Sequence, residues 1–171
     1  MNFIKVAFLL AILMRSIPLH AEISLPDFID HPIPESQVFT GTPESVDLSS
    51  YAGAKTYRTK LKEGGAQGPN FAGYYTVVSI GCGTQCQENW IINAKTGKIL
   101  HKFPSVIGVL FQLNSSLMIV NPPDAQFKKA YEEHPDQPLL GEIDTIYEVW
   151  KNNKFDLIHK DKWVNIIKDL S

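Results

Sequence analysis

Cysteine and the short motifs of known active sites are both scarce in this sequence. The 171 residues include only two cysteines. They contain no G-x-S-x-G nucleophile elbow, no H-E-x-x-H helix and no phosphate-binding loop. The glycine-rich stretch at residues 63–73, EGGAQGPNFAG, lacks the Lys-Ser/Thr pair that a phosphate cradle requires, so it predicts a shaped turn. No enzyme class is therefore indicated by a motif.

Basic residues are also few. The chain has 16 Lys and Arg against 18 Asp and Glu, and without Lys5 and Arg15, which belong to the N-terminal segment described next, the net charge is −4. Because nucleic-acid binding requires clustered lysines and arginines that neutralise phosphates, we expect no nucleic-acid partner. The 150 residues that follow that segment suit one domain, which buries about 70% of its unfolded surface.

Only the N-terminus carries a sustained apolar run. Lys5 precedes nine apolar residues from Val6 to Met14, Arg15 ends the run, and Ala21 places a small residue at a cleavage point. This layout is typical of a secretory signal peptide, and the run is shorter than the roughly 20 residues that span a bilayer. We therefore expect removal of residues 1–21, a periplasmic or secreted location, and no transmembrane segment in the mature chain.

The rest of the chain predicts an α+β fold. Residues 22–43 contain several prolines and no hydrophobic period, which indicates an extended lead-in to a single domain at residues 44–171. The turn sequences AKTG, NSS and KNN separate short runs rich in β-branched and aromatic residues. We expect an antiparallel meander of about six or seven strands. The predicted strands are 71–80, 89–93, 98–103, 106–113, 117–121, 145–150 and 154–159.

Helical spacing occurs in three further segments. In residues 50–65 apolar residues recur three and four apart, but part of the segment also alternates as a strand does, so both interpretations stay open. Residues 124–134 begin with a capping aspartate and end before Pro135. We expect a C-terminal helix over residues 160–170 to cover one face of the sheet. Its amphipathic stripe consists of Trp163, Ile166, Ile167 and Leu170.

Both cysteines lie in the stretch SIGCGTQCQENW at residues 79–90. In an exported protein a disulfide is the expected state of two nearby cysteines. Gly81 and Gly83 give the chain the freedom to bring the two Cα atoms within about 7 Å. A redox-active pair is the alternative, but such pairs usually have C-x-x-C spacing at the start of a helix, whereas three residues separate Cys82 from Cys86. The pattern favours a structural disulfide.

No metal site and no cofactor are expected. A closed zinc site needs a clustered set of cysteine and histidine ligands. The histidines of the mature chain are scattered singly along the sequence, at His31, His101, His134 and His159. Surface or turn positions explain them better than metal ligation.

Aromatic residues gather in sequence around the two cysteines. They are Phe71, Tyr74, Tyr75 and Trp90. Because neighbouring residues of a strand point to opposite faces, Tyr74 and Tyr75 cannot both belong to the core. We expect one of them to lie exposed near the disulfide and treat the four residues as a candidate binding surface. The alternative is a tyrosine that lies over a sheet edge or a loop.

Three segments of the chain resemble the core of a known family. They are NFAGYY at residues 70–75, GCGTQC at residues 81–86 and IINAKTGK at residues 91–98. Together with SSLMIVNPP and IYEVWKNNKFDLI further on, they resemble a family of small exported bacterial proteins with an NFAG-x-Y…GCG-x-x-C…II-D/N-x-x-TGK core and no known reaction. The resemblance covers residues 61–158 and implies bacterial export and a common β-rich core. Tyr74 stands where that family often has histidine.

These observations lead to two hypotheses of function. The first is a non-enzymatic binding or inhibitor-type module, stabilised by one disulfide, whose partner is an envelope or extracellular protein. The second is an envelope enzyme, either a thiol–disulfide exchanger that uses Cys82 and Cys86 or a hydrolase whose site only folding assembles. Small size and the lack of nucleophile–base sets favour the first.

Overall fold

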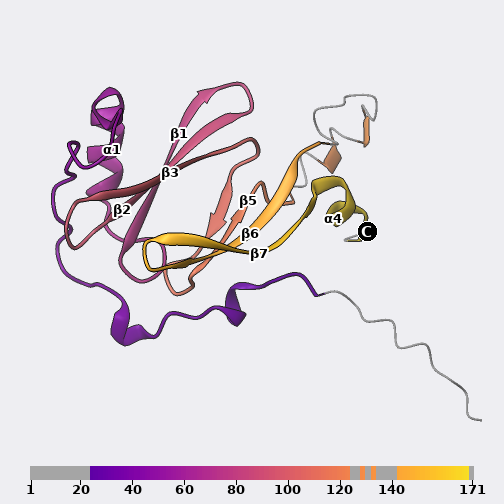
Figure 1. Cartoon of the computed structure of the whole chain (residues 1–171), viewed down its shortest axis with the longest axis horizontal. Coiled ribbons are helices and arrows are strands. Elements are labelled where there is room, and N and C mark those ends of the chain that lie inside the picture. Colours follow the sequence, from indigo (N-terminus) through magenta and orange to yellow (C-terminus); the bar gives the residue numbers. More distant parts are fainter. Residues whose placement is uncertain (1–23, 124–127, 130–131, 134–141, 170–171) are drawn as a thin grey trace, which may run out of the picture.

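The computed structural model describes residues 24–123, 128–129, 132–133 and 142–169. In these ranges the chain forms two antiparallel sheets (Figure 1). The first sheet contains β1 (Tyr75–Gly83), β2 (Cys86–Asn93) and β3 (Ile99–Ser105) in that spatial order. The second contains β4 (Val109–Phe111), β5 (Leu117–Val120), β6 (Asp144–Lys151) and β7 (Lys154–Lys162). The helices are η1 (Phe28–Asp30), η2 (Glu35–Gln37), η3 (Ala54–Tyr57), α1 (Arg58–Gly65) and α4 (Trp163–Asp169), where η marks a 3-10 helix.

The α+β class is confirmed, but the expected single meander is two meanders. Strands are consecutive within each sheet, and no ladder joins β3 to β4. The segment between them turns away because the amides of Val106 and Ile107 donate to the side-chain oxygen Oδ1 of Asn121, at 2.7 and 3.1 Å. Gly108, at φ +134°, completes the change of direction. The second sheet therefore starts as a separate layer.

The three predicted hairpin turns are confirmed. Gly97 adopts φ +69° between β2 and β3, and the NSS turn joins β4 to β5. Asn152 and Asn153 adopt φ +52° and +60° between β6 and β7, the left-handed pair that a tight hairpin needs. The sequence signal was reliable here because these conformations depend on the turn residues themselves.

The first strand begins later than predicted. We expected it at Phe71, but residues 71–74 form a turn in which Ala72 and Gly73 adopt φ +43° and +81°, and β1 starts at Tyr75. Tyr74 therefore precedes the strand, and the alternation argument does not apply to it. The rings of Tyr74 and Tyr75 lie 4.2 Å apart instead of on opposite faces.

The main core lies between the inner faces of the two sheets. It combines β1 and β2 residues with residues of β5 and β6, and the turn residue Phe71 is fully buried at its centre. Its buried members are Phe71, Ala72, Tyr75, Val77, Ile91, Met118, Val120 and Trp150. Each sheet therefore buries one of its faces against the other.

The outer faces of both sheets are covered by other parts of the chain. Helix α1 packs Leu61 against Val78 and Trp90 on the first sheet. Ile166 of α4, together with Leu25 and Phe28 of the lead-in, covers the second sheet. The lead-in follows the lower edge of the molecule in Figure 1. The C-terminal helix thus covers a sheet face as predicted, although it covers only part of one.

Two further expectations concern helices. Residues 50–65 form η3 and α1, so the helical interpretation is right and the strand interpretation is wrong. Most of the predicted helix at residues 124–134 lies outside the described residues, and residues 128–129 and 132–133 are helical. In the described parts of the chain, no helix is long and apolar enough to cross a membrane.

Gly97→Ala tests the contact between Ser45 and the turn that joins β2 to β3. An added Cβ would overlap the carbonyl oxygen of Ser45, and the backbone there has positive φ. We expect a loss of about 1–3 kcal/mol in the free energy of unfolding, measured by urea denaturation. Gly81→Ala is the control, because nothing lies within 4 Å of its added Cβ. Equal effects of the two variants would contradict this description of the contact.

Candidate functional site

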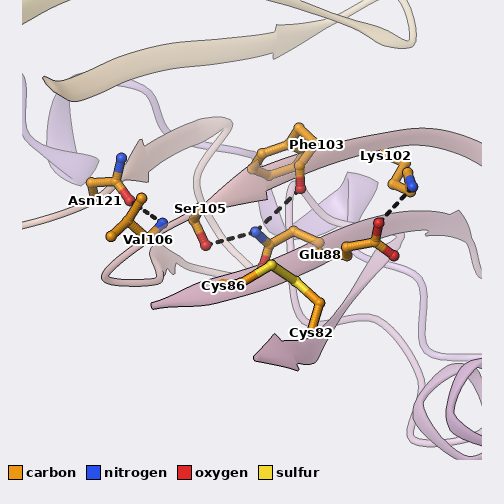
Figure 2. Close-up of a disulfide and its surroundings, with 9 residues drawn as sticks. Cys82, Cys86, Glu88, Lys102, Phe103, Ser105, Val106 and Asn121 are labelled. Atoms are coloured by element: carbon orange, nitrogen blue, oxygen red, sulfur yellow. Dashed lines mark hydrogen bonds and ion pairs between the residues drawn. A yellow bond between two sulfur atoms is a disulfide. The ribbon is translucent and has the colours of Figure 1, made fainter. Parts of the chain in front are cut away.

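The two cysteines form a disulfide at the tip of the hairpin that joins β1 to β2. Their Cα atoms are 5.1 Å apart, as the structural disulfide requires (Figure 2). Gly83 pairs with Cys86, and the ladder shifts register between Gly81 and Gly83. Gln85 adopts φ +54° within the turn. The disulfide therefore closes a tight, irregular loop at the end of two regular strands.

This tip, defined here as residues 81–85, extends away from the rest of the protein. All five residues are exposed. Nothing lies within 4 Å of a Cβ placed on Gly81 or Gly83. In Figure 1 the hairpin reaches the top edge of the molecule. A disulfide holds the conformation of a segment that no other part of the described chain supports.

A ladder of polar side chains secures the base of this hairpin. Ser79 donates through Oγ to Oδ1 of Asn89 at 2.7 Å, and Nδ2 of Asn89 donates to Oγ of Ser105 at 2.9 Å. Figure 2 shows Ser105 beside the disulfide-bearing strand. The three residues come from β1, β2 and β3, and Asn89 is fully buried. Because buried polar groups need partners, this ladder fixes how the three strands align below the tip.

An ion pair lies on the opposite face of the same sheet. Nζ of Lys102 is 2.7 Å from Oε1 of Glu88 (Figure 2). The same atom is 5.2 Å from the ring centroid of Trp90. The bond from Lys102 lowers the pKa of Glu88, and the bond to Glu88 raises the pKa of Lys102. Both shifts favour the charged forms. A carboxylate with a lowered pKa is a weaker base, so the pair suits structure rather than proton transfer.

The four aromatic residues of the candidate binding surface lie in the interior. Phe71 and Trp90 are fully buried, Tyr75 is 4% exposed, and Tyr74 is half-buried. Trp90 faces α1, whereas the other three belong to the cluster between the sheets. They therefore do not form one exposed surface. Tyr75 pairs with Asn93 at the far end of the hairpin, roughly 23 Å along the strand from Cys82.

Tyr75, with Tyr74 bonded to it, instead joins the two sheets. Their hydroxyl oxygens are 2.8 Å apart, and the Tyr75 hydroxyl donates to Oδ1 of Asn153 at 2.8 Å. Burial, and the bond with Tyr74, raise the pKa of Tyr75. Nζ of Lys95 lies 4.2 Å from the ring centroid of Tyr74. A tyrosine with a raised pKa remains protonated at neutral pH, which fits a clamp between β1 and the β6–β7 turn.

His101 is a titratable residue within the aromatic part of the core. It lies 5.6 Å from the ring of Phe155 and 5.9 Å from that of Phe103, between ring centroids. Burial lowers the pKa of His101. The imidazole is half-buried on β3, the edge strand of the first sheet. At this edge, side chains of β3 contact Phe155 of β7, the edge strand of the second sheet. It is a neutral aromatic packing group at neutral pH.

Comparison of the chain with protein-family models, curated proteins and solved structures finds no match. The site has to be interpreted from its own geometry. Throughout the described ranges, no group of three or more His, Cys, Asp or Glu side chains could hold a metal ion. We therefore take the exposed, disulfide-closed tip, together with the polar ladder below it, as the candidate site.

Sequence reasoning placed the disulfide correctly but missed the residues that support it. Ser79, Asn89 and Ser105 carry no motif, and their meeting depends on the register of three strands. A partial signal was present, because Gly81 and Gly83 flank Cys82 in a strand. Glycines inside a strand often mark a bulge or a close backbone approach.

His101→Phe tests the neutral state of the half-buried imidazole. Because its pKa is lower in the folded protein, the unfolded state binds more protons below about pH 6.5, and stability falls as the pH decreases through that value. We expect the variant to lose less stability than wild type between about pH 7 and pH 5, measured by thermal unfolding. Phe111→Leu keeps the imidazole together with Phe103 and Phe155, and it should retain the wild-type pH dependence. An unchanged pH dependence in His101→Phe would contradict the assignment.

Proposed function

We propose that the mature chain is an exported binding module of inhibitor type, which holds a partner protein through the tip at residues 81–85. The observation that carries this proposal is a segment that is exposed along its whole length and yet held by a disulfide. A segment already ordered before binding loses little conformational entropy when it docks. Loops of this kind are suited to recognition rather than to catalysis.

Two ion-paired carboxylates of the described residues are consistent with a non-enzymatic role. Glu88 and Lys102 neutralise each other, and Lys160 and Lys162 approach Asp144 at 2.8 and 3.2 Å. The bonds from these lysines lower the pKa of Asp144. Catalytic acids and bases usually have pKa values displaced toward neutrality. The pKa values of Glu88 and Asp144 are displaced the other way, whereas burial raises the pKa of Glu148 on β6.

The sequence features of export and family are consistent with such a module. The signal-peptide pattern at residues 1–21 predicts an oxidising compartment, where a disulfide persists. The family-like segments fall on the turn before β1, on the tip and on the β2–β3 turn. We propose that the chain belongs with the resembling exported bacterial proteins and that its partner is an envelope or extracellular protein.

Exposure of Cys82 favours thiol–disulfide exchange as a second candidate function. In that reaction a substrate dithiol would give two electrons to the disulfide, leaving Cys82 and Cys86 as thiols and the substrate oxidised. The tip contains no lysine, arginine or histidine, and no helix starts there, so nothing nearby stabilises a thiolate. We therefore rank this function below binding.

Affinity capture tests the binding proposal. Immobilised mature protein, residues 22–171, is expected to retain a specific partner from envelope extract or culture medium. The matched variant Cys82→Ser/Cys86→Ser should retain at least about tenfold less, because an unconstrained tip loses entropy on docking. It should remain folded by circular dichroism, with at most about 2 kcal/mol less stability, since the closed loop is short.

The possible results separate the two functions. Equal capture by the double serine variant would contradict a role for the constrained tip. No capture by the wild-type protein would contradict binding. Repeated oxidation of a model dithiol peptide by wild-type protein, with a regenerating oxidant present, would establish the exchange function instead.

A further inference from the structure

The sheets expose four edge strands, and three of them carry features that hinder the addition of another strand. Native edges are commonly protected by lysine, proline, bulges or short length. Strand β7 carries three lysines and a bulge at Ile158. Strand β3 contains Pro104, which has no N–H to donate, next to its last residue, and β4 has only three residues. The fourth edge, on β1, has to be considered residue by residue.

The first half of the β1 edge is occupied by the chain itself. The Tyr75 amide donates to the carbonyl of Phe71 at 3.0 Å. The Val77 amide donates to Oδ1 of Asn70 at 2.8 Å, and Nδ2 of Asn70 donates to the Val77 carbonyl at 3.1 Å. The N–H and C=O groups of Tyr75 and Val77 therefore point away from β2 and have partners.

The second half of the same edge is free. In a strand, backbone groups point to the same side at every second residue, so those of Ser79 and Gly81 point outward as those of Val77 do. Both residues are exposed, and their backbone groups on this side have no partner among the described residues. The ladder with β2 stays regular as far as Gly81. The N–H and C=O groups of Ser79 and Gly81, two donors and two acceptors, thus face solvent where β1 enters the tip.

The surroundings of this free edge suit an extended peptide. Gly81 has no side chain, and nothing lies within 4 Å of an added Cβ, so another backbone can approach closely. No charged residue occurs from Ser79 to Gln87, and Glu88 is already paired with Lys102. Apart from the register shift between Gly81 and Gly83, where the free segment ends, the edge lacks the protection seen on β3, β4 and β7.

We propose that an extended segment of the partner protein adds to the first sheet by pairing with Ser79 and Gly81 of β1, next to the disulfide-closed tip. This inference rests on the proposed function and specifies how the partner is recognised. Backbone hydrogen bonds would provide affinity, as in other cases of strand addition. The segment facing residues 79–87 should be uncharged, so binding should depend little on salt concentration.

A second copy of this chain fits the edge less well. A two-fold axis at Ile80 would place Ser79 opposite Gly81 of the other copy, which allows four hydrogen bonds. The Ile80 side chain is buried within its own domain, and Gly81 adds no side-chain surface. Stable interfaces bury about 1,200 Å² or more, which so short a contact does not reach. A partner that also contacts the tip can bury more.

Short random peptides displayed on phage, selected on the mature protein, provide the probe. A synthetic copy of the selected peptide is added to isotope-labelled protein, and amide exchange is followed by NMR. We expect exchange at Ser79 and Gly81 to slow by about tenfold or more. Gly81→Pro removes the donor, and Gly81→Lys adds charge where there is room for it, so each should weaken peptide binding by about tenfold.

Two matched controls make the result specific. Leu110→Lys adds a charge to the exposed edge strand β4 and should leave binding close to wild type. Leu157→Lys alters the exposed edge strand β7 and should have no effect. Folding of each variant is checked by its NMR spectrum.

Several outcomes would overturn the inference. These are selection of no peptide, protection of other amides, equal binding by Gly81→Pro, or protection at Ser79 and Gly81 that depends on protein concentration alone. The last would indicate self-association. If the affinity capture succeeds while Gly81→Pro still captures the partner as well as wild type does, the proposed function stands and only the strand addition fails.

Discussion

Packing between the inner faces of the two sheets is the constraint on which the other features of this domain depend. Phe71, Ile91 and Met118 are fully buried there and come from a turn and from both sheets. Each such side chain stabilises the fold by roughly 1.5–3 kcal/mol relative to an exposed one. Because Phe71 is held in this core, residues 70–71 lie against the first half of β1 and occupy its edge. The free part of the edge begins where that contact ends.

The candidate site follows from the same arrangement. The base of the hairpin is held on one face by the Ser79–Asn89–Ser105 ladder and on the other by the pair of Glu88 with Lys102. Beyond these contacts the hairpin extends away from the rest of the described chain, and the disulfide between Cys82 and Cys86 holds its end. An ordered yet exposed segment results, and its backbone groups are available to a partner. The ion pair of Glu88 with Lys102 contributes to this order.

Local signals in the sequence were reliable where local chemistry decides the conformation. Gly97 and Asn153 were recognised as turn residues because positive φ is tolerated by few residue types. Pairing of Cys82 with Cys86 was recognised because short spacing and flanking glycines allow it. The aromatic surface was not predictable in this way. Whether Trp90 is exposed depends on α1, which precedes it by more than twenty residues and packs on that face of the sheet.

The sequence by itself determined the α+β class, the hairpin turns and the disulfide, because each depends on hydrophobic period or on residues close together in the chain. Only the tertiary structure decided that the strands form two sheets, that Tyr75, with Tyr74 bonded to it, joins them, and that Ser79 and Gly81 keep a free edge. These features depend on pairing between distant segments, such as Asn121 with Val106 and Asn70 with Val77. Strand register and side-chain bonds of this kind are selected by the packed core as a whole, which no local pattern encodes.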